Sequence, residues 1–196
     1  MNTPRYPSSL AERFDLRLPV VQAPMAGASN PAFVAAACNA GALGSLGASG
    51  MPPDKLAAAV AEIRAATSRP FAVNLFVLKP ASPDEATVRR ALEAIDPLRA
   101  ELGLPAGHAL DRYAPDFRAQ LEALIELRVP VASFTFDVLS ADDVARLKAA
   151  GSYVIGTATH VAEGIAWRDA GADAVAAQGG EAGGHRGTFI GAFEDA

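Results

Sequence analysis

Short apolar runs alternate with amphipathic segments along almost the whole chain, and this alternation restricts the fold more than any other feature. The strand-like runs lie at residues 18–25, 42–46, 71–77, 129–136, 153–156 and 172–177. Segments with the helical spacing of apolar residues separate these runs. Such an alternation predicts an α/β protein with a parallel sheet of about six strands, joined by right-handed helical crossovers.

Two architectures satisfy this alternation: an open, doubly wound sheet and a closed barrel. No G-x-G-x-x-G follows the first strand-like run, so the dinucleotide fingerprint of the doubly wound class is missing. Candidate site residues end several successive strands, at Met25, Asn74 and Gln178, whereas an open sheet concentrates its site at one switch point. We therefore expect a TIM (β/α)8 barrel, truncated after about the sixth strand because the chain ends at Ala196. An open six-stranded sheet is the alternative.

The alternation loosens once, over residues 79–114. This region holds a helical stretch at 84–102, followed by a segment broken by Gly and Pro at 103–108. We interpret it as an insertion that covers one face of a single domain spanning residues 1–196.

Composition limits the classes of partner. Hydrophobic residues make up 51% and charged residues 20% of the chain, which is typical of a globular protein. The net charge of −5 and the lack of a basic tract argue against nucleic-acid binding. The apolar runs are too short to span a bilayer, and the N-terminus lacks the shape of a signal peptide. The single cysteine, Cys38, excludes an internal disulfide, so we expect a cytoplasmic protein. His108 and His160 have no Cys or His at metal-ligand spacing, so no metal site is predicted.

The last strand-like run leads into a glycine-rich loop, residues 178–187. Five of its ten residues are glycine, and the others include Gln178, Glu181, His185 and Arg186. Glycine allows the backbone to approach another molecule closely, and the carboxyl end of a parallel strand is where small-molecule sites form. This loop is therefore the leading candidate for a binding site.

The sequence resembles the nitronate monooxygenase family, formerly called 2-nitropropane dioxygenases, which are FMN-dependent TIM barrels. The matching segments are residues 19–25, 73–76, 133–136, 156–159, 170–174 and 178–187. They cover nearly all of the chain in order, and the glycine loop with its His is the most specific of them. The sequence departs from the family at Asp137, where a glycine is usual. The resemblance implies a flavoprotein with one FMN-binding barrel domain, in which loops following Ala196 hold much of the FMN phosphate.

His185 is the candidate catalytic residue, because the resemblance implies that it lies beside the flavin ring at the substrate nitro group. Its ordinary pKa near 6.5 would let it exchange a proton at neutral pH. It would act as a general base on a neutral nitroalkane or hold an anionic nitronate. The alternative is a loop histidine that only caps a backbone group.

The resemblance also implies a set of cofactor-binding residues. They are Ala23, Pro24, Met25, Asn74, Gln178, Gly183 and Gly184. The alternatives are a Met that fills a gap in the core, an Asn bonded to backbone, and a tight turn that needs glycine for its φ angles. Arg186 could pair with an anionic substrate or phosphate, or with an acid such as Glu181.

Three functions are compatible with the sequence. The first is an FMN-dependent nitronate monooxygenase, an oxidoreductase that oxidises alkyl nitronates with O₂ to a carbonyl compound and nitrite. Its partners would be a small nitronate or nitroalkane and O₂. The second keeps the flavin but changes the reaction, to an FMN-dependent enoyl-[acyl-carrier-protein] reductase or an NAD(P)H:quinone reductase. The third is an inactive barrel fragment.

Overall fold

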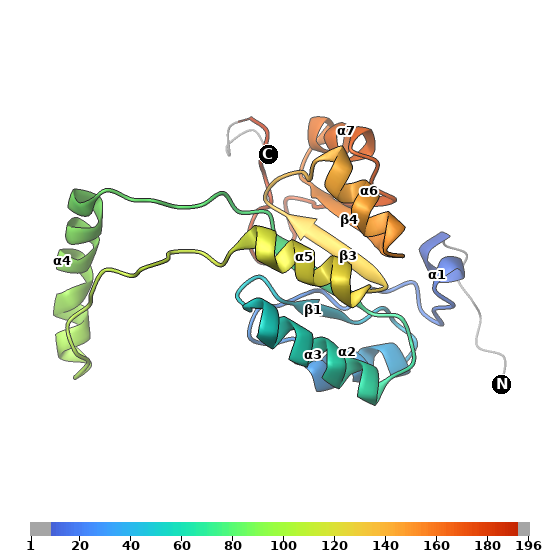
Figure 1. Ribbon diagram of the computed structural model, residues 1–196, viewed down its shortest axis with the longest axis horizontal. Coiled ribbons are helices and arrows are strands. Elements are labelled where there is room, and N and C mark those ends of the chain that lie inside the picture. The colour runs from blue at the N-terminus through green and yellow to red at the C-terminus, as the bar shows by residue number, and fades with distance from the viewer. Residues whose placement is uncertain (1–8, 192–196) are drawn as a thin grey trace. The chain divides into compact units, whose positions relative to one another are not determined.

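The structure of the protein is a computed structural model that describes residues 9–191; residues 1–8 and 192–196 of the predicted domain lie outside the described part. Helices and strands alternate along the chain (Figure 1). The helices are α1 Ser9–Arg13, α2 Pro31–Asn39, α3 Pro53–Ala66, α4 Glu85–Glu101, α5 Phe117–Leu127, α6 Ala141–Ala149 and α7 Val161–Asp169. The strands are β1 Ser45–Gly47, β2 Ala72–Phe76, β3 Val131–Thr135, β4 Tyr153–Ala158 and β5 Ala174–Ala177.

The five strands form one parallel sheet in the order β1-β2-β3-β4-β5, so each strand pairs with its neighbour in the sequence. A doubly wound sheet reverses its strand order at a switch point, and no reversal occurs here. The predicted parallel α/β class is therefore confirmed, and the strand order is that of a barrel.

The period of two in each strand separates two environments. Side chains such as Val73, Leu75 and Phe134 are fully or almost fully buried against the helices, in one cluster that includes residues of α2, α3, α5, α6 and α7. Residues at the alternate positions face the other side of the sheet. At the amino ends of the strands a second cluster covers that side, where Ala11 and Leu16 pack with Leu43, Ala72 and Val131. Helix α1, which was not predicted, belongs to this cover.

Several helix ends are capped by side chains or by glycine. The Asn30 and Ser140 side chains accept hydrogen bonds from the backbone N–H groups of Phe33 and Asp143 at the starts of α2 and α6. Helices α2, α6 and α7 are followed by Gly41, Gly151 and Gly171, which lie in the left-handed region with φ of 96°, 98° and 92°.

The first predicted strand, residues 18–25, is wrong as a buried strand. The segment is extended but forms only a single parallel bridge, between Val21 and Leu43. Val20 and Val21 are 51% and 43% exposed, because no described strand covers the far side of this edge. Pro19 and Pro24 also lack the N–H groups that a longer ladder needs.

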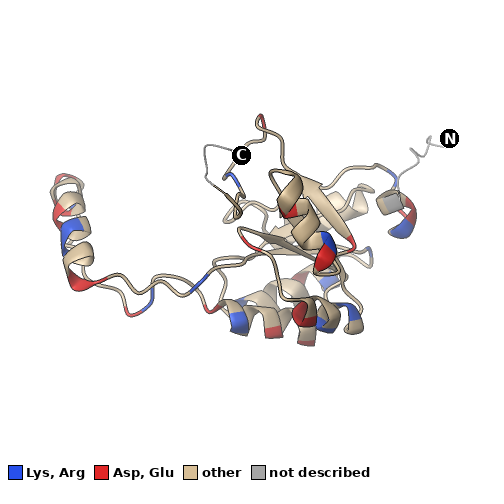
Figure 2. Cartoon of the chain, turned by 90° about the horizontal axis from the view of Figure 1, so that it is seen from above, with Lys and Arg blue, Asp and Glu red and all other residues tan. Residues whose placement is uncertain are grey.

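Residues Lys79–Pro115 form a compact unit of their own. It contains α4, which begins at the Asp84 N-cap and has no buried residue. Within the unit, the Asp96 carboxylate accepts a hydrogen bond of 2.7 Å from the Gly107 N–H. Figure 2 shows acidic and basic residues mixed along the helices of the chain. None of the described helices is both long enough and apolar enough to cross a membrane.

Candidate functional site

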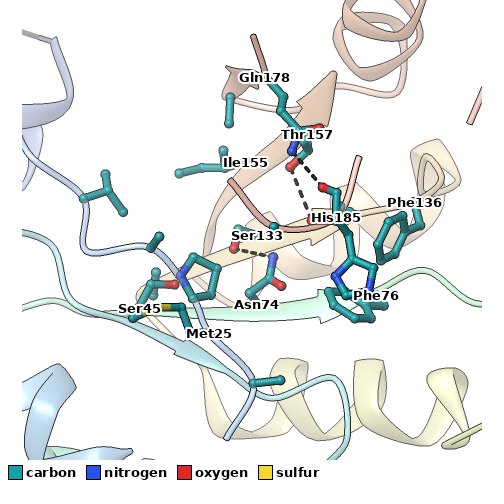
Figure 3. A pocket seen from close by; sticks show the side chains of 18 of the residues that line it. Met25, Ser45, Asn74, Phe76, Ser133, Phe136, Ile155, Thr157, Gln178 and His185 are labelled. Atoms are coloured by element: carbon teal, nitrogen blue, oxygen red, sulfur yellow. Dashed lines mark hydrogen bonds between the residues drawn. The ribbon is translucent and has the colours of Figure 1, made fainter. Parts of the chain in front are cut away.

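A cavity of about 650 Å³ lies on the face of the sheet opposite the helices (Figure 3). Every strand of the sheet, or the loop after it, contributes to its wall. All eight predicted site residues line it: Ala23, Pro24, Met25, Asn74, Gln178, Gly183, Gly184 and His185. The structure thus brings together residues that are up to 162 positions apart, from 23 to 185.

The alternation of side chains along the strands produces a row of polar groups in this wall. Asn74 is 5% exposed and donates a hydrogen bond of 3.0 Å to the Ser133 hydroxyl on the neighbouring strand. The Thr135 and Thr157 hydroxyl oxygens lie 3.4 Å apart on β3 and β4. Apolar side chains occupy the same face closer to the amino ends of the strands, so the cavity has a polar rim over an apolar floor.

The Asn74 side chain donates to another side chain, whereas the alternative interpretation expected it to bond to backbone. Its amide oxygen has no hydrogen-bond partner among the described residues, yet no buried side-chain polar atom in this part of the chain is unsatisfied. The oxygen therefore reaches the cavity, where it can accept a hydrogen bond from a ligand.

The segment that contains Met25 is held by one serine. The Ser29 hydroxyl donates to the Met25 carbonyl oxygen and accepts from the Met25 N–H, each at 2.8 Å. The same hydroxyl oxygen lies 3.2 Å from the Gly47 N–H on β1. Because Gly47 has no side chain, the backbone of residues 25–26 lies directly against it. The Met25 side chain is 42% exposed and is not part of the core.

Two polar side chains of the glycine loop form hydrogen bonds with the backbone of the same loop. The Gln178 amide donates to the His185 carbonyl oxygen and accepts from the Gly187 N–H, both at 2.8 Å. In the described part of the chain Arg186 makes no ion pair with an acid; its guanidinium donates to the carbonyl oxygens of Gln178 and Gly179, at 3.1 and 2.9 Å. Gln178 is therefore occupied in shaping the loop that carries His185.

Gly183 and Gly184 lie at the open side of the loop. A Cβ atom added at either would meet nothing within 4 Å, and only Gly184 has a positive φ, of 83°. Neither N–H group has a hydrogen-bond partner among the described residues. These two groups can approach and bind an acceptor on a ligand.

The His185 ring lies beside two aromatic rings at the rim of the cavity (Figure 3). Its centroid is 6.0 Å from that of Phe136 and 6.5 Å from that of Phe76, and those two rings meet edge to face at 4.6 Å. Neither ring nitrogen of His185 has a hydrogen-bond partner in the described part of the chain. The imidazole is thus available to a ligand and is not the backbone cap of the alternative interpretation.

Phe136 has an unusual backbone. Its φ is +79°, in the left-handed region that a bulky side chain rarely occupies. It directly follows β3, and its ring lines the cavity. Strain of this kind is concentrated at binding sites. Asp137, the residue that departs from the family pattern, follows immediately, and its carboxylate accepts a 2.9 Å hydrogen bond from the Val138 N–H.

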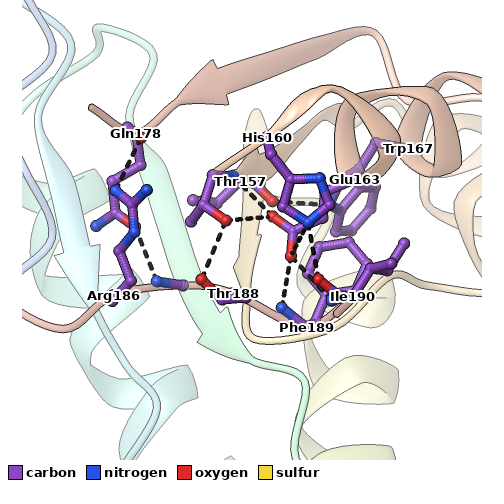
Figure 4. A network of polar contacts seen from close by, with 11 residues as sticks. Thr157, His160, Glu163, Trp167, Gln178, Arg186, Thr188, Phe189 and Ile190 are labelled. Carbon is purple, nitrogen blue, oxygen red and sulfur yellow. Dashed lines mark hydrogen bonds and ion pairs between the residues drawn. The ribbon is translucent and has the colours of Figure 1, made fainter. Parts of the chain in front are cut away.

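A second polar network fixes the segment that leaves the loop (Figure 4). Glu163, in the first turn of α7, is fully buried and accepts hydrogen bonds from the Phe189 and Ile190 N–H groups and from Thr159. Burial alone would raise the pKa of the Glu163 carboxyl, but the N–H donors of Phe189, Thr159 and Ile190 together lower it. Glu163 is therefore a buried carboxylate that holds its charge through hydrogen bonds.

Several residues of the site were missed from the sequence as individual candidates. They are Phe76, Ser133, Thr135, Phe136, Thr157 and Glu163. The period of two would have found the strand residues, because they lie two positions from Asn74 or alternate within β3 and β4. Glu163 gives no such signal, since an acid in a first helical turn is common.

The chain was compared with known proteins. The sequence profile of the family described as nitronate monooxygenase matches residues 8–195. The nitronate monooxygenase of Paraburkholderia phytofirmans is 42% identical over 181 residues, which are 90% of this chain and 50% of that protein. The probable nitronate monooxygenase of Staphylococcus haemolyticus is 38% identical over 94% of this chain and 52% of its own length.

Solved structures agree with these sequence matches. The nitroalkane oxidase of Streptomyces ansochromogenes superposes with a TM-score of 0.83 at 39% identity, covering 96% of this chain and 53% of that one. FabK from Thermotoga maritima gives 0.67 at 27% identity, with 94% and 48% coverage. The chain spans about half the length of the relatives it matches, and its sheet corresponds to about half of their barrels. This confirms the prediction of an incomplete (β/α)8 barrel.

Proposed function

The chain belongs to the nitronate monooxygenase family, and we propose that its cavity binds FMN and oxidises alkyl nitronates with O₂ to a carbonyl compound and nitrite. The observation that carries the proposal is the convergence of the eight candidate residues on one cavity, with His185 as the single ionisable side chain among the described residues that line it. No Asp or Glu belongs to that lining, so nothing there repels an anionic nitronate.

The described residues fit a flavin in size and chemistry. A cavity of about 650 Å³ lies within the range of cofactor sites. Such sites combine apolar walls with a few fixed polar groups, and here these groups are the Asn74 amide oxygen and the free N–H groups of Gly183 and Gly184. The extended segment of residues 23–25 would lie along the flavin. When bound, FMN supplies the electron transfer between the nitronate and O₂.

His185 handles the proton in this scheme. With a neutral nitroalkane, a free imidazole nitrogen takes the proton from the carbon that bears the nitro group. With a preformed nitronate, the same ring donates a hydrogen bond to a nitronate oxygen. The Phe76 and Phe136 rings lie beside it and give this part of the cavity an apolar wall.

The direct test is O₂ uptake by the purified protein with alkyl nitronates, alongside nitrite release. His185→Ala should lower kcat/KM for neutral nitroalkanes by about 10²–10⁴-fold, the usual contribution of a general base. Preformed nitronates should lose much less, because they need no deprotonation. His108→Ala is the matched control, since His108 belongs to the separate compact unit Lys79–Pro115. Equal losses with both substrate forms would contradict the assigned role of His185.

The reductase alternatives have a separate test. An enoyl-[acyl-carrier-protein] or quinone reductase would show bleaching of its flavin by NADH or NADPH without oxygen, and reoxidation by the second substrate. The inactive-fragment alternative predicts neither a cooperative thermal transition nor stoichiometric FMN in the purified chain.

A further inference from the structure

We propose that Glu163, which does not line the cavity, is the positioning residue that holds His185 in place. It does so through the return arm, defined as residues 187–190, which follows His185 directly. The effect on catalysis rests on the function proposed above for His185. The effect on the position of the ring does not, and it is measured separately.

Glu163 is a buried charge with no Lys or Arg partner among the described residues. Its Oε1 accepts hydrogen bonds from the Phe189 N–H at 2.6 Å and the Ile190 N–H at 3.0 Å. Its Oε2 accepts from the Thr159 N–H at 2.7 Å and the Thr159 hydroxyl at 2.8 Å. Among the residues that the structure describes, the ionisable group beside it is His160, whose Nε2 lies 3.6 Å from Oε1 and 2.8 Å from the Ile190 carbonyl oxygen. The carboxylate thus links the β4–α7 turn to the return arm.

The positions of these donors along the chain show that Glu163 does more than cap α7. Capping of α7 needs only the local contacts with Thr159, four residues earlier in the chain. The Phe189 and Ile190 N–H groups come from 26 and 27 residues later, and the protein offers them no other acceptor among the described residues. A buried carboxylate is costly unless its hydrogen bonds are satisfied, and half of the bonds made here fasten the arm.

His185 lies between two fastening points. On one side, the Gln178 amide binds the His185 carbonyl oxygen and the Gly187 N–H. On the other side, Glu163 binds the arm at Phe189 and Ile190 (Figure 4). The Thr188 hydroxyl oxygen of the arm also lies 3.1 Å from the Thr159 hydroxyl oxygen. If the Glu163 fastening is lost, the remaining polar contacts of the arm with the start of α7 are those of the Ile190 carbonyl oxygen with His160 Nε2, at 2.8 Å, and of Thr188 with Thr159. The His185 side of the loop is then held less firmly, and the ring can leave Phe76 and Phe136.

The position of the ring can be measured without any ligand. Phe76 and Phe136 lie within 6.5 Å of the His185 ring, so their ring currents should displace its proton signals in an NMR spectrum. The chain has three histidines, which makes assignment simple, and His108, in the compact unit Lys79–Pro115, serves as an internal reference. Amide exchange at Phe189 and Ile190 reports on the arm itself.

The variant Glu163→Ala removes all four acceptor contacts. We expect the His185 signals to move toward those of His108 and the Phe189 and Ile190 amides to exchange faster. Glu122→Ala is the matched control, because it removes a carboxylate that pairs with Arg146 between α5 and α6. In that variant the His185 signals should stay at their wild-type positions. Unchanged His185 signals in folded Glu163→Ala would overturn the proposal.

A second variant covers the case in which Glu163→Ala does not fold. Glu163→Gln keeps the volume, but three of the four donors are backbone N–H groups, so its NH₂ faces at least one of them in either orientation. The His185 signals should again move, and wild-type signals would overturn the proposal. With nitroalkanes, the folded variant should lose kcat more than it changes KM. If the His185 signals moved but O₂ uptake were unaltered, the positioning of His185 by Glu163 would be supported and the catalytic role of His185 proposed above would be contradicted.

Discussion

Gly47→Ala tests the packing of the cavity wall, because Gly47 touches backbone and not flexible side chains. A Cβ atom at this position would lie 2.8 Å from the Ala26 nitrogen, 2.8 Å from the Met25 carbonyl carbon and 3.0 Å from the Met25 nitrogen. Real Cβ contacts are almost never so short. The Met25 backbone cannot retreat freely, since the Ser29 hydroxyl bonds it on both its N–H and its carbonyl oxygen.

The expected cost follows from two opposing effects. Overpacking of a well-packed site costs about 1–3 kcal/mol. Replacement of glycine by alanine restores about 0.4–1 kcal/mol by restricting the unfolded chain. The free energy of unfolding should therefore fall by about 1–2 kcal/mol, which corresponds to about 2–8 °C in Tm for a chain of this length. Because the displaced segment lines the cavity, ligand affinity should fall as well.

Urea and thermal unfolding, followed by circular dichroism, measure this cost. Gly50→Ala is the matched control three residues away, because its added Cβ would meet nothing within 4 Å. That variant should be as stable as the wild type or slightly more so. If Gly47→Ala were as stable as Gly50→Ala, the close approach of residues 25–26 to β1 would be refuted.

Three further predictions concern other parts of the sheet. Gly156→Ala would drive a Cβ into the fully buried Trp167 indole, and should lower the free energy of unfolding by about 3 kcal/mol in urea titrations. A loss smaller than that of Gly47→Ala would contradict the close packing of the indole against Gly156. Phe136→Gly should be about 1 kcal/mol more stable than Phe136→Ala, because only glycine adopts a φ of +79° without strain. If Phe136→Ala were the more stable variant in the same titration, backbone strain at this position would be excluded. In acid, the wild type should lose stability as the pH falls from the ordinary Glu pKa, about 4.3, toward the lowered pKa of Glu163 in the folded protein, because over that range the carboxyl takes up a proton in the unfolded chain but stays ionised in the folded one. Glu163→Gln should show a slope of free energy against pH that is smaller by about 1.4 kcal/mol per pH unit in that range, and equal slopes would refute the assignment.

The sequence predicted the order of elements well because each pattern has a local cause. Alternation of strand and helix signals specified the parallel class, and the structure has that class. The segment at residues 18–25 was predicted as a buried strand because its apolar run resembles one. Whether a run is covered depends on the neighbours that flank it, and that information is not local.

In the candidate site, too, some features follow from local sequence patterns and others depend on the fold. The structure places the eight predicted residues in the wall of one cavity, because they lie at or after the ends of extended segments along one parallel sheet. The functions of individual side chains were harder to foresee. Arg186 binds carbonyl oxygens and Gln178 binds its own loop, and both contacts depend on the fold of the loop. Glu163 acts on residues 26 and 27 positions away, which no short motif encodes.

The central claim, that this cavity binds flavin against the glycine loop, is tested most directly by FMN titration of two alanine variants. In both Gly183→Ala and Gly180→Ala the added Cβ meets no protein atom within 4 Å, and neither glycine has a positive φ, so neither change should alter the free protein. Only Gly183 lines the cavity. The account predicts saturable FMN binding at one site per chain, weakened by about tenfold or more in Gly183→Ala, or about 1.4 kcal/mol, and unchanged in Gly180→Ala. Absence of FMN binding to the wild type, or equal affinities in the two variants, would contradict it.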